Sequence, residues 1–279
     1  MRDDMLALLA YWIDEREAIR QRRAVGLLKP WSDDPVFQQY RFCNVDREDD
    51  KVTGWIRENW RKPYQYHPNL WFAMCIARLV NWPDTLQELG FPETWDPSRF
   101  VQVLQAREAR GEKVWTGAYM IRGSHIKGTD KPTWVAENLT SVWCAGEYPG
   151  PRGVDTLSMY HGRLMRHRGF GSFLSAQVVA DLKHTRWLCD APDWWNWAAP
   201  GPGSTQGLNR IMGRPLETKV HPEQFIEEWK SVRRAVAPTL RSRRVTMCLQ
   251  NWQNCGCEFD KYCRVKEGGR ARNRFAGAV

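Results

Sequence analysis

Apolar residues recur at helical spacing along most of the chain. Each such segment places apolar side chains three or four positions apart, which indicates an amphipathic or buried helix. These segments are residues 3–23, 69–82, 97–110, 132–144, 156–166 and 222–237. Pro83 and Gly111 end two of them, since proline and glycine interrupt helices. Alternating strand patterns are sparse and no internal repeat is present, so the sequence predicts an all-α fold.

The first predicted helix is apolar on one side and basic at its end. Leu6, Leu9, Ile13 and Ile19 form the apolar side. Four arginines follow in the second half of this helix: Arg16, Arg20, Arg22 and Arg23. These arginines form either a solvated face or a functional one. We favour the solvated face, because charge runs on helices usually face water.

A glycine-rich turn precedes another apolar helical run. Gly169 and Gly171 flank Phe170, and the apolar run from Phe173 to Leu182 follows. Glycines before a helix let the backbone approach a phosphate, and the free N–H groups at a helix start bind anions. A short helix, this turn and a second helix would form a helix–hairpin–helix, with which helical DNA glycosylases hold one DNA phosphate. The alternative is an ordinary helical corner with a glycine C-cap.

A second glycine-rich helix start follows the tryptophan-rich stretch at residues 190–197. Gly201, Gly203 and Ser204 lie in the sequence G-P-G-S, which makes them a second candidate phosphate site. The length of 279 residues suits one glycosylase-like helical domain. The loop at residues 147–154 could divide it into lobes of about 1–150 and 151–279.

Composition favours a polyanionic partner. The net charge is +9, from 41 Lys and Arg against 32 Asp and Glu, and the chain holds 16 tryptophans. A basic, tryptophan-rich protein suits nucleic acid, since aromatic rings stack on bases. No apolar run approaches the roughly 20 residues of a membrane span, and the N-terminus is too short and acidic for a signal peptide. We therefore expect a cytoplasmic protein with no membrane partner and with cysteines kept as thiols or ligands.

Charged and amide residues crowd the segment from Tyr40 to Ile56. Asp46 can cap a helix that begins at Arg47, which is the structural interpretation. In the functional interpretation, Arg41, Asn44 and Arg47 provide anion and amide contacts in a site. Arg122 lies in a polar, glycine-rich stretch at residues 116–131, and that residue either contacts an anion or lies in a surface turn.

Four cysteines near the end of the chain follow a spacing close to a metal motif. Cys248, Cys255, Cys257 and Cys263 give C-x6-C-x-C-x5-C, one residue short of the iron–sulfur loop of some DNA glycosylases. An iron–sulfur cluster or a zinc knot is one interpretation. The other is that most of these cysteines are not ligands, and that the chain holds no metal there.

Base-excision chemistry does not fit the hairpin. When G-F-G-S-F-L-S-A is aligned with the glycosylase pattern G-V-G-x-K-T-A, the catalytic lysine position falls on Phe173. The position of the catalytic aspartate falls near Gly201, and Asp190 and Asp193 could replace it only with a rearranged loop. The glycosylase scaffold therefore fits, whereas its catalytic residues are missing.

Four motifs in order resemble one phage family. They are F-C-N-V-D-R-E-D-D, H-R-G-F-G-S-F-L-S-A-Q-V-V-A-D-L, G-P-G-S-T-Q-G-L-N-R and C-E-F-D-K-Y. The family is known as alpha-glutamyl/putrescinyl-thymine pyrophosphorylases and as the helical domain of 5-hydroxymethyl-dU (5-hmdU) DNA kinases. Its members resemble repurposed helical DNA glycosylases of bacteriophage thymidine hypermodification. The resemblance covers about residues 35–275.

The resemblance implies an amino-acid:DNA transferase. Such an enzyme replaces the pyrophosphate of pyrophosphorylated 5-hydroxymethyluracil in double-stranded DNA with an amino acid or polyamine. The printed sequence has no G-x-x-x-x-G-K-[ST] nucleotide loop, so the kinase role is not expected. The alternatives are a non-catalytic DNA-binding module that partners a kinase, and a base glycosylase.

The implied roles follow this chemistry. Glu258, Asp260 or Asp49 would take the proton of the amine. Positive charge for the leaving pyrophosphate, alone or with Mg²⁺, would come from four side chains: Arg41, Arg47, Arg122 and Lys261. Asn44 would read the uracil edge, and Asp190 and Trp195 would line the pocket of a flipped base. DNA phosphates would lie at two helix starts: Gly169, Gly171 and Ser172, and Gly201, Gly203 and Ser204. The family motif carries one cysteine, which corresponds to Cys257.

Overall fold

The computed structural model describes residues 1–117, 129–242 and 247–271. Within these ranges the chain is helical and contains no β-strand, so the predicted all-α class is confirmed. Each predicted helix forms within three residues of its expected bounds. Among the described residues, no helix combines the length and apolar character that a membrane crossing requires.

The chain divides into two compact units. Unit 1 comprises Met1–Asp50 and Trp195–Val279, and unit 2 comprises Lys51–Trp194. The boundary suggested by the sequence, near residue 150, instead lies within unit 2. The difference arises because the N-terminal helix packs against helices from the end of the chain, a long-range contact that no local glycine or proline signal reports.

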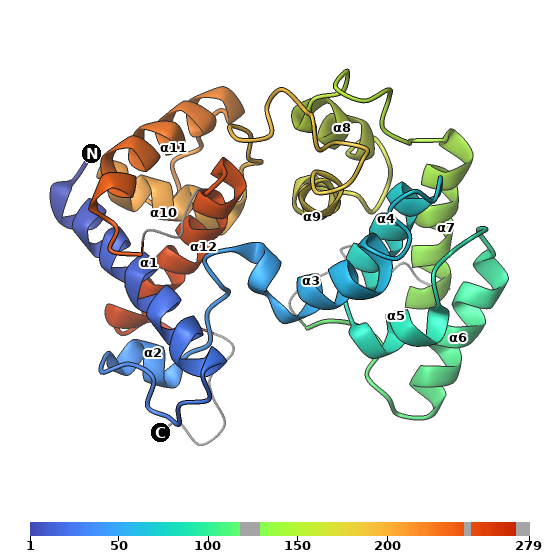
Figure 1. Ribbon diagram of the computed structural model, residues 1–279, viewed down its shortest axis with the longest axis horizontal. Helices are drawn as coiled ribbons and strands as arrows, with labels where there is room; N and C mark the ends of the chain where they lie inside the picture. Colours follow the sequence, from blue (N-terminus) through green and yellow to red (C-terminus); the bar gives the residue numbers. More distant parts are fainter. Residues whose placement is uncertain (118–128, 243–246, 272–279) are drawn as a thin grey trace. The chain divides into compact units, whose positions relative to one another are not determined.

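Unit 1 is built from helices at both ends of the sequence (Figure 1). Its elements are α1 (Asp3–Ala24), α2 (Pro35–Gln39), the 3₁₀ turn η1 (Arg47–Asp49), α10 (Pro202–Met212), α11 (Pro222–Val236), the 3₁₀ turn η3 (Ala237–Thr239) and α12 (Leu249–Lys266). Its core joins Trp12 of α1 to Trp229 of α11 and Phe259 of α12. Burial of large aromatic side chains of this kind contributes about 1.5–3 kcal/mol each.

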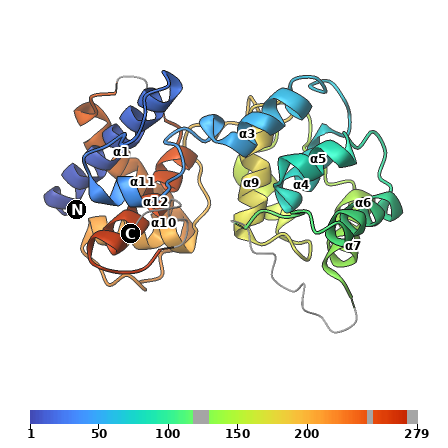
Figure 2. The same ribbon diagram turned by 90° about the horizontal axis from the view of Figure 1, so that it is seen from below.

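Two glycines allow α10 and α12 to cross at close range (Figure 2). A Cβ atom added to Gly207 would lie 2.1 Å from the carbonyl oxygen of Gly256. A Cβ atom added to Gly256 would lie 2.2 Å from Cζ2 of Trp229 on α11. The absence of side chains at these two positions therefore sets the separation of three helices.

Unit 2 is organised around a buried helix. Its elements are α3 (Lys51–Ile56), the π-helical turn η2 (Arg57–Arg61), α4 (Leu70–Val80), α5 (Pro83–Leu89), α6 (Pro97–Ala109), α7 (Lys131–Ala145), α8 (Leu157–Leu164) and α9 (Ser172–Leu182). Every residue of α4 is buried, and this helix packs against α9 and α7. Side chains of Asp96, Asp130 and Thr156 cap α6, α7 and α8, as expected for these residue types at helix starts.

A buried ion pair joins α4 to α9. Arg78 donates from Nε and Nη2 to the two carboxylate oxygens of Asp181, at 2.5 and 2.7 Å. The same guanidinium donates to Thr53 and to Asn81. Because both charges are fully enclosed, this fork fixes the register of the two helices, and loss of either partner alone would leave a buried charge unpaired.

Candidate functional site

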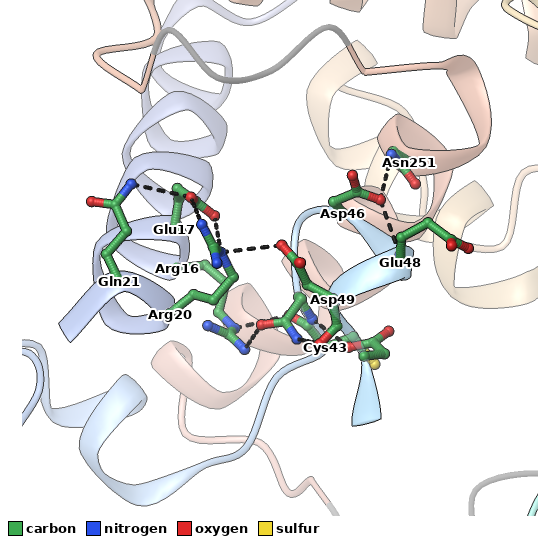
Figure 3. A network of polar contacts seen from close by, with 11 residues as sticks. Arg16, Glu17, Arg20, Gln21, Cys43, Asp46, Glu48, Asp49 and Asn251 are labelled. Carbon is green, nitrogen blue, oxygen red and sulfur yellow. Dashed lines mark hydrogen bonds and ion pairs between the residues drawn. The ribbon is translucent and has the colours of Figure 1, made fainter. Parts of the chain in front are cut away.

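A network of polar contacts in unit 1 surrounds the loop at residues 41–50, and α1 holds this loop in place (Figure 3). Arg16 donates from Nε to the carbonyl oxygens of Cys43 and Phe42, at 2.9 and 3.3 Å. Its Nη2 donates to Oδ1 of Asn44. The side chain is only 5% exposed, and this burial lowers the pKa of Arg16 despite the nearby carboxylate of Asp50.

A second arginine of α1, on the same face of the helix, also contacts this loop. Arg20 pairs with Asp49 at 3.2 Å and with Glu17 at 2.5 Å, and the hydrogen bond to Glu17 is the main cause that raises the pKa of Arg20. The expectation of a solvated basic face is therefore wrong for Arg16 and Arg20. The spacing Leu9, Ile13, Arg16, Arg20 was the available signal, since steps of four, three and four residues keep all four on one helix face.

Asn44 closes the loop on itself. Its backbone N–H donates to Oδ1 of Asp50 at 2.9 Å, and its Nδ2 donates to the carbonyl of Asp49 at 2.8 Å. Its carbonyl accepts from Asn254 of α12. Burial raises the pKa of Asp50, while the hydrogen bond from Asn44 opposes that shift. The amide of Asn44 is therefore used in the loop, where the sequence predicted a contact with a base edge.

From the other side, α12 presents Glu258 and Lys261 to the loop. Oε2 of Glu258 accepts from the backbone N–H of Cys43 at 3.2 Å and from Nζ of Lys261 at 3.4 Å. Lys261 also donates to the carbonyl of Arg41 and lies 4.5 Å from the ring centroid of Phe42. Within the described part of the chain, Oε1 of Glu258 accepts no hydrogen bond. The site therefore holds a carboxylate with one available oxygen beside an ammonium group.

Asp260 points away from this site. Two residues along a helix correspond to a rotation of about 200°, so Glu258 and Asp260 face opposite sides of α12. Oδ1 of Asp260 accepts from Nε of Arg210 on α10 at 2.8 Å, and Arg210 also pairs with Glu267. Asp260 is almost fully buried and is committed to this helix–helix ion pair.

Three further loop residues from the sequence analysis lie at the same site. Asp46 caps η1 through the N–H of Glu48, as predicted, and contacts Asn251 of α12 at 3.4 Å. Arg47 begins η1, and among the described residues its side chain makes no hydrogen bond or ion pair. Arg41 is exposed and contributes its carbonyl to Lys261.

The predicted phosphate site at the start of α10 is used for packing. A Cβ atom added to Gly203 would lie 2.5 Å from Sγ of Cys257 on α12. Oγ of Ser204 accepts from the N–H of Gly201 and from Gln253 of α12. Close approach of a helix, rather than of a phosphate, accounts for the glycine at position 203.

In unit 2, the α8–α9 hairpin leaves its helix start accessible. Gly169 has a φ of +85°, and a Cβ atom there would meet Trp134 at 3.1 Å. Gly171 is the N-cap residue of α9 and has open space beside it. His161 of α8 contacts the carbonyl of Ser172 at 2.9 Å. Phe173, at the lysine position of glycosylases, is 47% exposed.

The remaining predicted residues lie elsewhere or outside the described ranges. Asp190 forms an exposed ion pair with Arg152 in unit 2, while Asp193 caps α8 through the N–H groups of Leu157 and Ser158. Trp195 is half exposed in unit 1, and its carbonyl accepts from Leu249 and Arg233. Arg122 lies in residues 118–128, outside the described residues.

The four cysteines are distributed around α12. At about 100° per residue, Cys257 lies opposite Cys255, and Cys255 approaches the carbonyl of Val45 at 3.9 Å. Burial raises the pKa of Cys263 to about 12. Among residues 1–117, 129–242 and 247–271, no three His, Cys, Asp or Glu side chains are arranged to hold a metal ion.

Comparisons with known proteins give one consistent result. A family model described as the helical domain of 5-hmdU DNA kinase matches residues 3–270. A 5-hmdU DNA kinase of Bacillus phage SP10 is 40% identical over 126 residues, which cover 42% of this chain. The match covers 20% of that relative's length. No solved structure matches the chain.

Proposed function

Because the chain belongs to the family of 5-hmdU DNA kinase helical domains, we propose that it acts in phage thymidine hypermodification as an amine:DNA transferase. The substrate would be DNA that carries pyrophosphorylated 5-hydroxymethyl-dU. The enzyme would exchange the pyrophosphate for an amine. The observation that supports this function best is the pairing of Glu258, with one available carboxylate oxygen, with Lys261 at the loop of residues 41–50.

The proposed step requires one base and a source of positive charge. A neutral amine attacks the methylene carbon on C5 of the base, so a C–N bond forms while the C–O bond to pyrophosphate breaks. The attacking nitrogen releases one proton, which Oε1 of Glu258 accepts. Lys261, Arg41 and Arg47 stabilise the charge on the departing pyrophosphate, alone or with Mg²⁺. Asp260 is excluded from this step by its buried pair with Arg210.

DNA binding is assigned to the hairpin of unit 2. The N-cap residue of α9, Gly171, has open space beside it, and a helix start of this kind suits one phosphate. Gly169 provides the left-handed turn that brings α8 and α9 together. We accordingly propose a helix–hairpin–helix of the glycosylase type, with Phe173 where a glycosylase has its lysine.

The test is a nucleoside digest. Double-stranded DNA with pyrophosphorylated 5-hydroxymethyl-dU is incubated with the protein, amino acids and polyamines, then digested and measured by mass spectrometry. An amine-adduct nucleoside in the wild-type reaction, and its loss with Glu258→Gln, would support the transferase. Glu223→Gln is the matched control, because Glu223 is an exposed glutamate in the first turn of α11. Abasic sites would instead indicate a glycosylase.

One observation favours a second function. The curated relative is a kinase, and the match spans only a fifth of it, as expected for an accessory domain. In that case the chain would bind DNA and assist a kinase, and it would catalyse no reaction itself. Unchanged modified base together with tight DNA binding, in the same digest, would favour this second function.

A further inference from the structure

A serine, a histidine and a glutamate form a chain of polar contacts in unit 2. Nδ1 of His167 lies 3.2 Å from Oγ of Ser141, and Nε2 of the same ring lies 3.1 Å from Oε1 of Glu147. Both distances suit hydrogen bonds. Ser141 belongs to α7, Glu147 to the segment after this helix, and His167 to the turn between α8 and α9. The candidate site of unit 1 uses none of these residues.

The local fold positions each member of this triad. Gly146 ends α7 in the left-handed conformation, with a φ of +60°, so the chain turns sharply just before Glu147. The carbonyl of Glu147 accepts from the hydroxyl of the buried Tyr160 at 2.9 Å. The backbone N–H of His167 donates to the carbonyl of Leu164 at 3.0 Å, which fixes the turn that carries the imidazole.

The contacts determine which imidazole nitrogen carries the proton. A carboxylate only accepts hydrogen bonds, so Nε2 of His167 donates to Glu147. In the neutral imidazole, Nδ1 is then unprotonated and accepts from the hydroxyl of Ser141. A histidine held in this way can remove a proton from a serine while the carboxylate keeps the ring in orientation. The proton therefore has a defined path from Oγ to Nδ1.

The exposure of the three side chains follows the order that a nucleophile needs. Ser141 is exposed, whereas the side chains of His167 and Glu147 are only 10% and 18% exposed. A substrate can reach the hydroxyl, while the two groups that activate it are shielded. The second carboxylate oxygen of Glu147 lies 3.8 Å from Nε of Arg163, which also pairs with Asp155 at 2.5 Å. These ion pairs hold the orienting carboxylate from behind.

An arginine adds positive charge on the same side of α7. The guanidinium carbon of Arg168 lies 5.4 Å from the ring centroid of Trp134. Trp134 precedes Ser141 by seven residues, which corresponds to about two turns and to the same helix face. Arg168 is exposed, so its guanidinium is accessible to an anionic group of a substrate that also reaches the serine.

We propose that unit 2 carries a second reaction site, an esterase in which Ser141 is the nucleophile and His167 the base. Oγ of Ser141 attacks the acyl carbon, and its proton passes to Nδ1 of His167. A new C–O bond forms, the C–O bond to the alcohol breaks, and the alcohol leaves with that proton. Water, deprotonated by the same nitrogen, then releases the acid and restores the serine. The substrate class is a small carboxylic ester whose acyl chain carries a carboxylate for Arg168.

The first experiment labels the serine in the full chain. A fluorophosphonate probe, which reacts with activated serines, is added to the protein, and the labelled peptides are identified by mass spectrometry. We expect label on Ser141 that is lost in the His167→Gln variant. Ser158 is the internal control, as an exposed serine of α8 in the same unit. No label on Ser141, or equal label on Ser158, would overturn the proposal.

The second experiment measures turnover. The mono-4-nitrophenyl ester of adipic acid is compared with 4-nitrophenyl hexanoate, a neutral ester of the same chain length. We expect the acidic ester to have the higher kcat/KM, and Arg168→Met to remove this preference. Ser141→Ala should lower the rate by about a hundredfold or more, while Ser158→Ala should leave it unchanged. Hydrolysis that does not depend on Ser141, or a preference for the neutral ester, would overturn the proposal.

Glu147 is a positioning residue, and its test separates orientation from binding. The amide of Glu147→Gln can donate to Nε2 and so favours the tautomer in which Nδ1 already carries the proton. We expect kcat to fall at least about tenfold while KM stays unchanged. A raised KM with an unchanged kcat would overturn this role.

A cysteine in place of the serine tests the base without any ester. Cys144 is the natural reference, because it is an exposed thiol three residues further along α7. In the Ser141→Cys variant, the thiol beside His167 should react with iodoacetamide about tenfold faster than Cys144. Adding His167→Gln should remove this difference, and equal rates in the single variant would overturn the proposal. These assays contain neither DNA nor an amine, so their outcome is independent of the proposed function.

Discussion

At the scale of single residues, Glu258 and Asp260 have the same charge and opposite surroundings. Glu258 accepts hydrogen bonds from the loop and from Lys261. Asp260 is enclosed with Arg210 between α10 and α12. A helix rotates by about 100° per residue, so two positions suffice to separate a group available for chemistry from one that stabilises the fold.

These two residues should respond differently to the same change. Glu258→Gln should abolish amine transfer while it leaves the thermal midpoint nearly unchanged. The glutamine amide has the same shape as the carboxylate that it replaces, but it is uncharged and cannot act as the base. Asp260→Asn should lower the free energy of unfolding by about 3 kcal/mol, since it leaves Arg210 without its buried counter-charge. Thermal unfolding and the nucleoside digest, run on both variants, check this. Equal loss of stability in both would contradict the assignment.

Sequence reasoning named Glu258, Lys261, Arg41, Asn44 and Arg47, which the structure brings together at one loop, but it did not name Arg16 as part of that site. The first group lies in motifs crowded with charge, whereas Arg16 looked like one more arginine in a basic helix end. Its role depends on where the loop of residues 41–50 returns, and that is a tertiary contact. The ion pair of Asp260 with Arg210 and the packing of Gly203 against Cys257 could not be predicted for the same reason. In each case the partner lies about 50 residues away in the sequence.

At the scale of elements, local chemistry determines where the helices lie. Asp-Pro at residues 34–35 and 96–97, and Asp130 two residues before Pro132, start α2, α6 and α7 with a side-chain cap and a proline in the first turn. Proline and a capping aspartate both favour that position. The helices were therefore predictable from the sequence, whereas their packing partners were not.

The crossing of α10 and α12 depends on a missing side chain. Gly207→Ala should destabilise unit 1 by about 3 kcal/mol, because the new methyl group would overlap the Gly256 carbonyl. That corresponds to a fall of roughly 6–12 °C in the thermal midpoint. Gly162→Ala is the control, since Gly162 is an exposed position of α8 with open space around it, and it should gain about 0.5–1 kcal/mol. Similar midpoints for the two variants would contradict this packing argument.

The α8–α9 hairpin should be sensitive to acid. Burial lowers the pKa of His161, and its contact with the Ser172 carbonyl opposes that shift only in part. The unfolded chain therefore takes up a proton near pH 6.5 that the folded chain resists, so stability falls as the pH drops below about 6.5. One proton contributes at most about 1.4 kcal/mol per pH unit. Thermal midpoints between pH 7.5 and 5.5 should fall less steeply for His161→Gln, and an unchanged slope would exclude His161 as the cause.

At the scale of the whole molecule, the proposed function requires that the net charge attract DNA. The net charge of +9 is larger than the charge of any single cluster described above. The attraction to a duplex is therefore spread over the surface. Charge of this kind speeds association and adds affinity without reading sequence. Under the proposed function, specificity for the modified base must then come from the candidate site rather than from the charge.

DNA binding should consequently depend steeply on salt. With about four phosphate contacts, affinity should fall on the order of a hundredfold between 50 and 200 mM salt. Fluorescence anisotropy with a labelled duplex checks this, and unmodified DNA should give the same slope as modified DNA. A slope near zero would show that the positive charge is not used on DNA.

The division of the chain also has a consequence during its synthesis. The ribosome makes Met1–Asp50 before the 144 residues of unit 2, and only after these the segment from Trp195 that completes unit 1. At 5–20 residues per second, α1 waits roughly 7–30 s for its partners, with Trp12, Ile13 and Leu9 uncovered. Unit 2, which is one continuous stretch, can fold during that interval. The candidate site therefore forms after unit 2, and a nascent chain that stops before α12 carries the hairpin without Glu258 and Lys261.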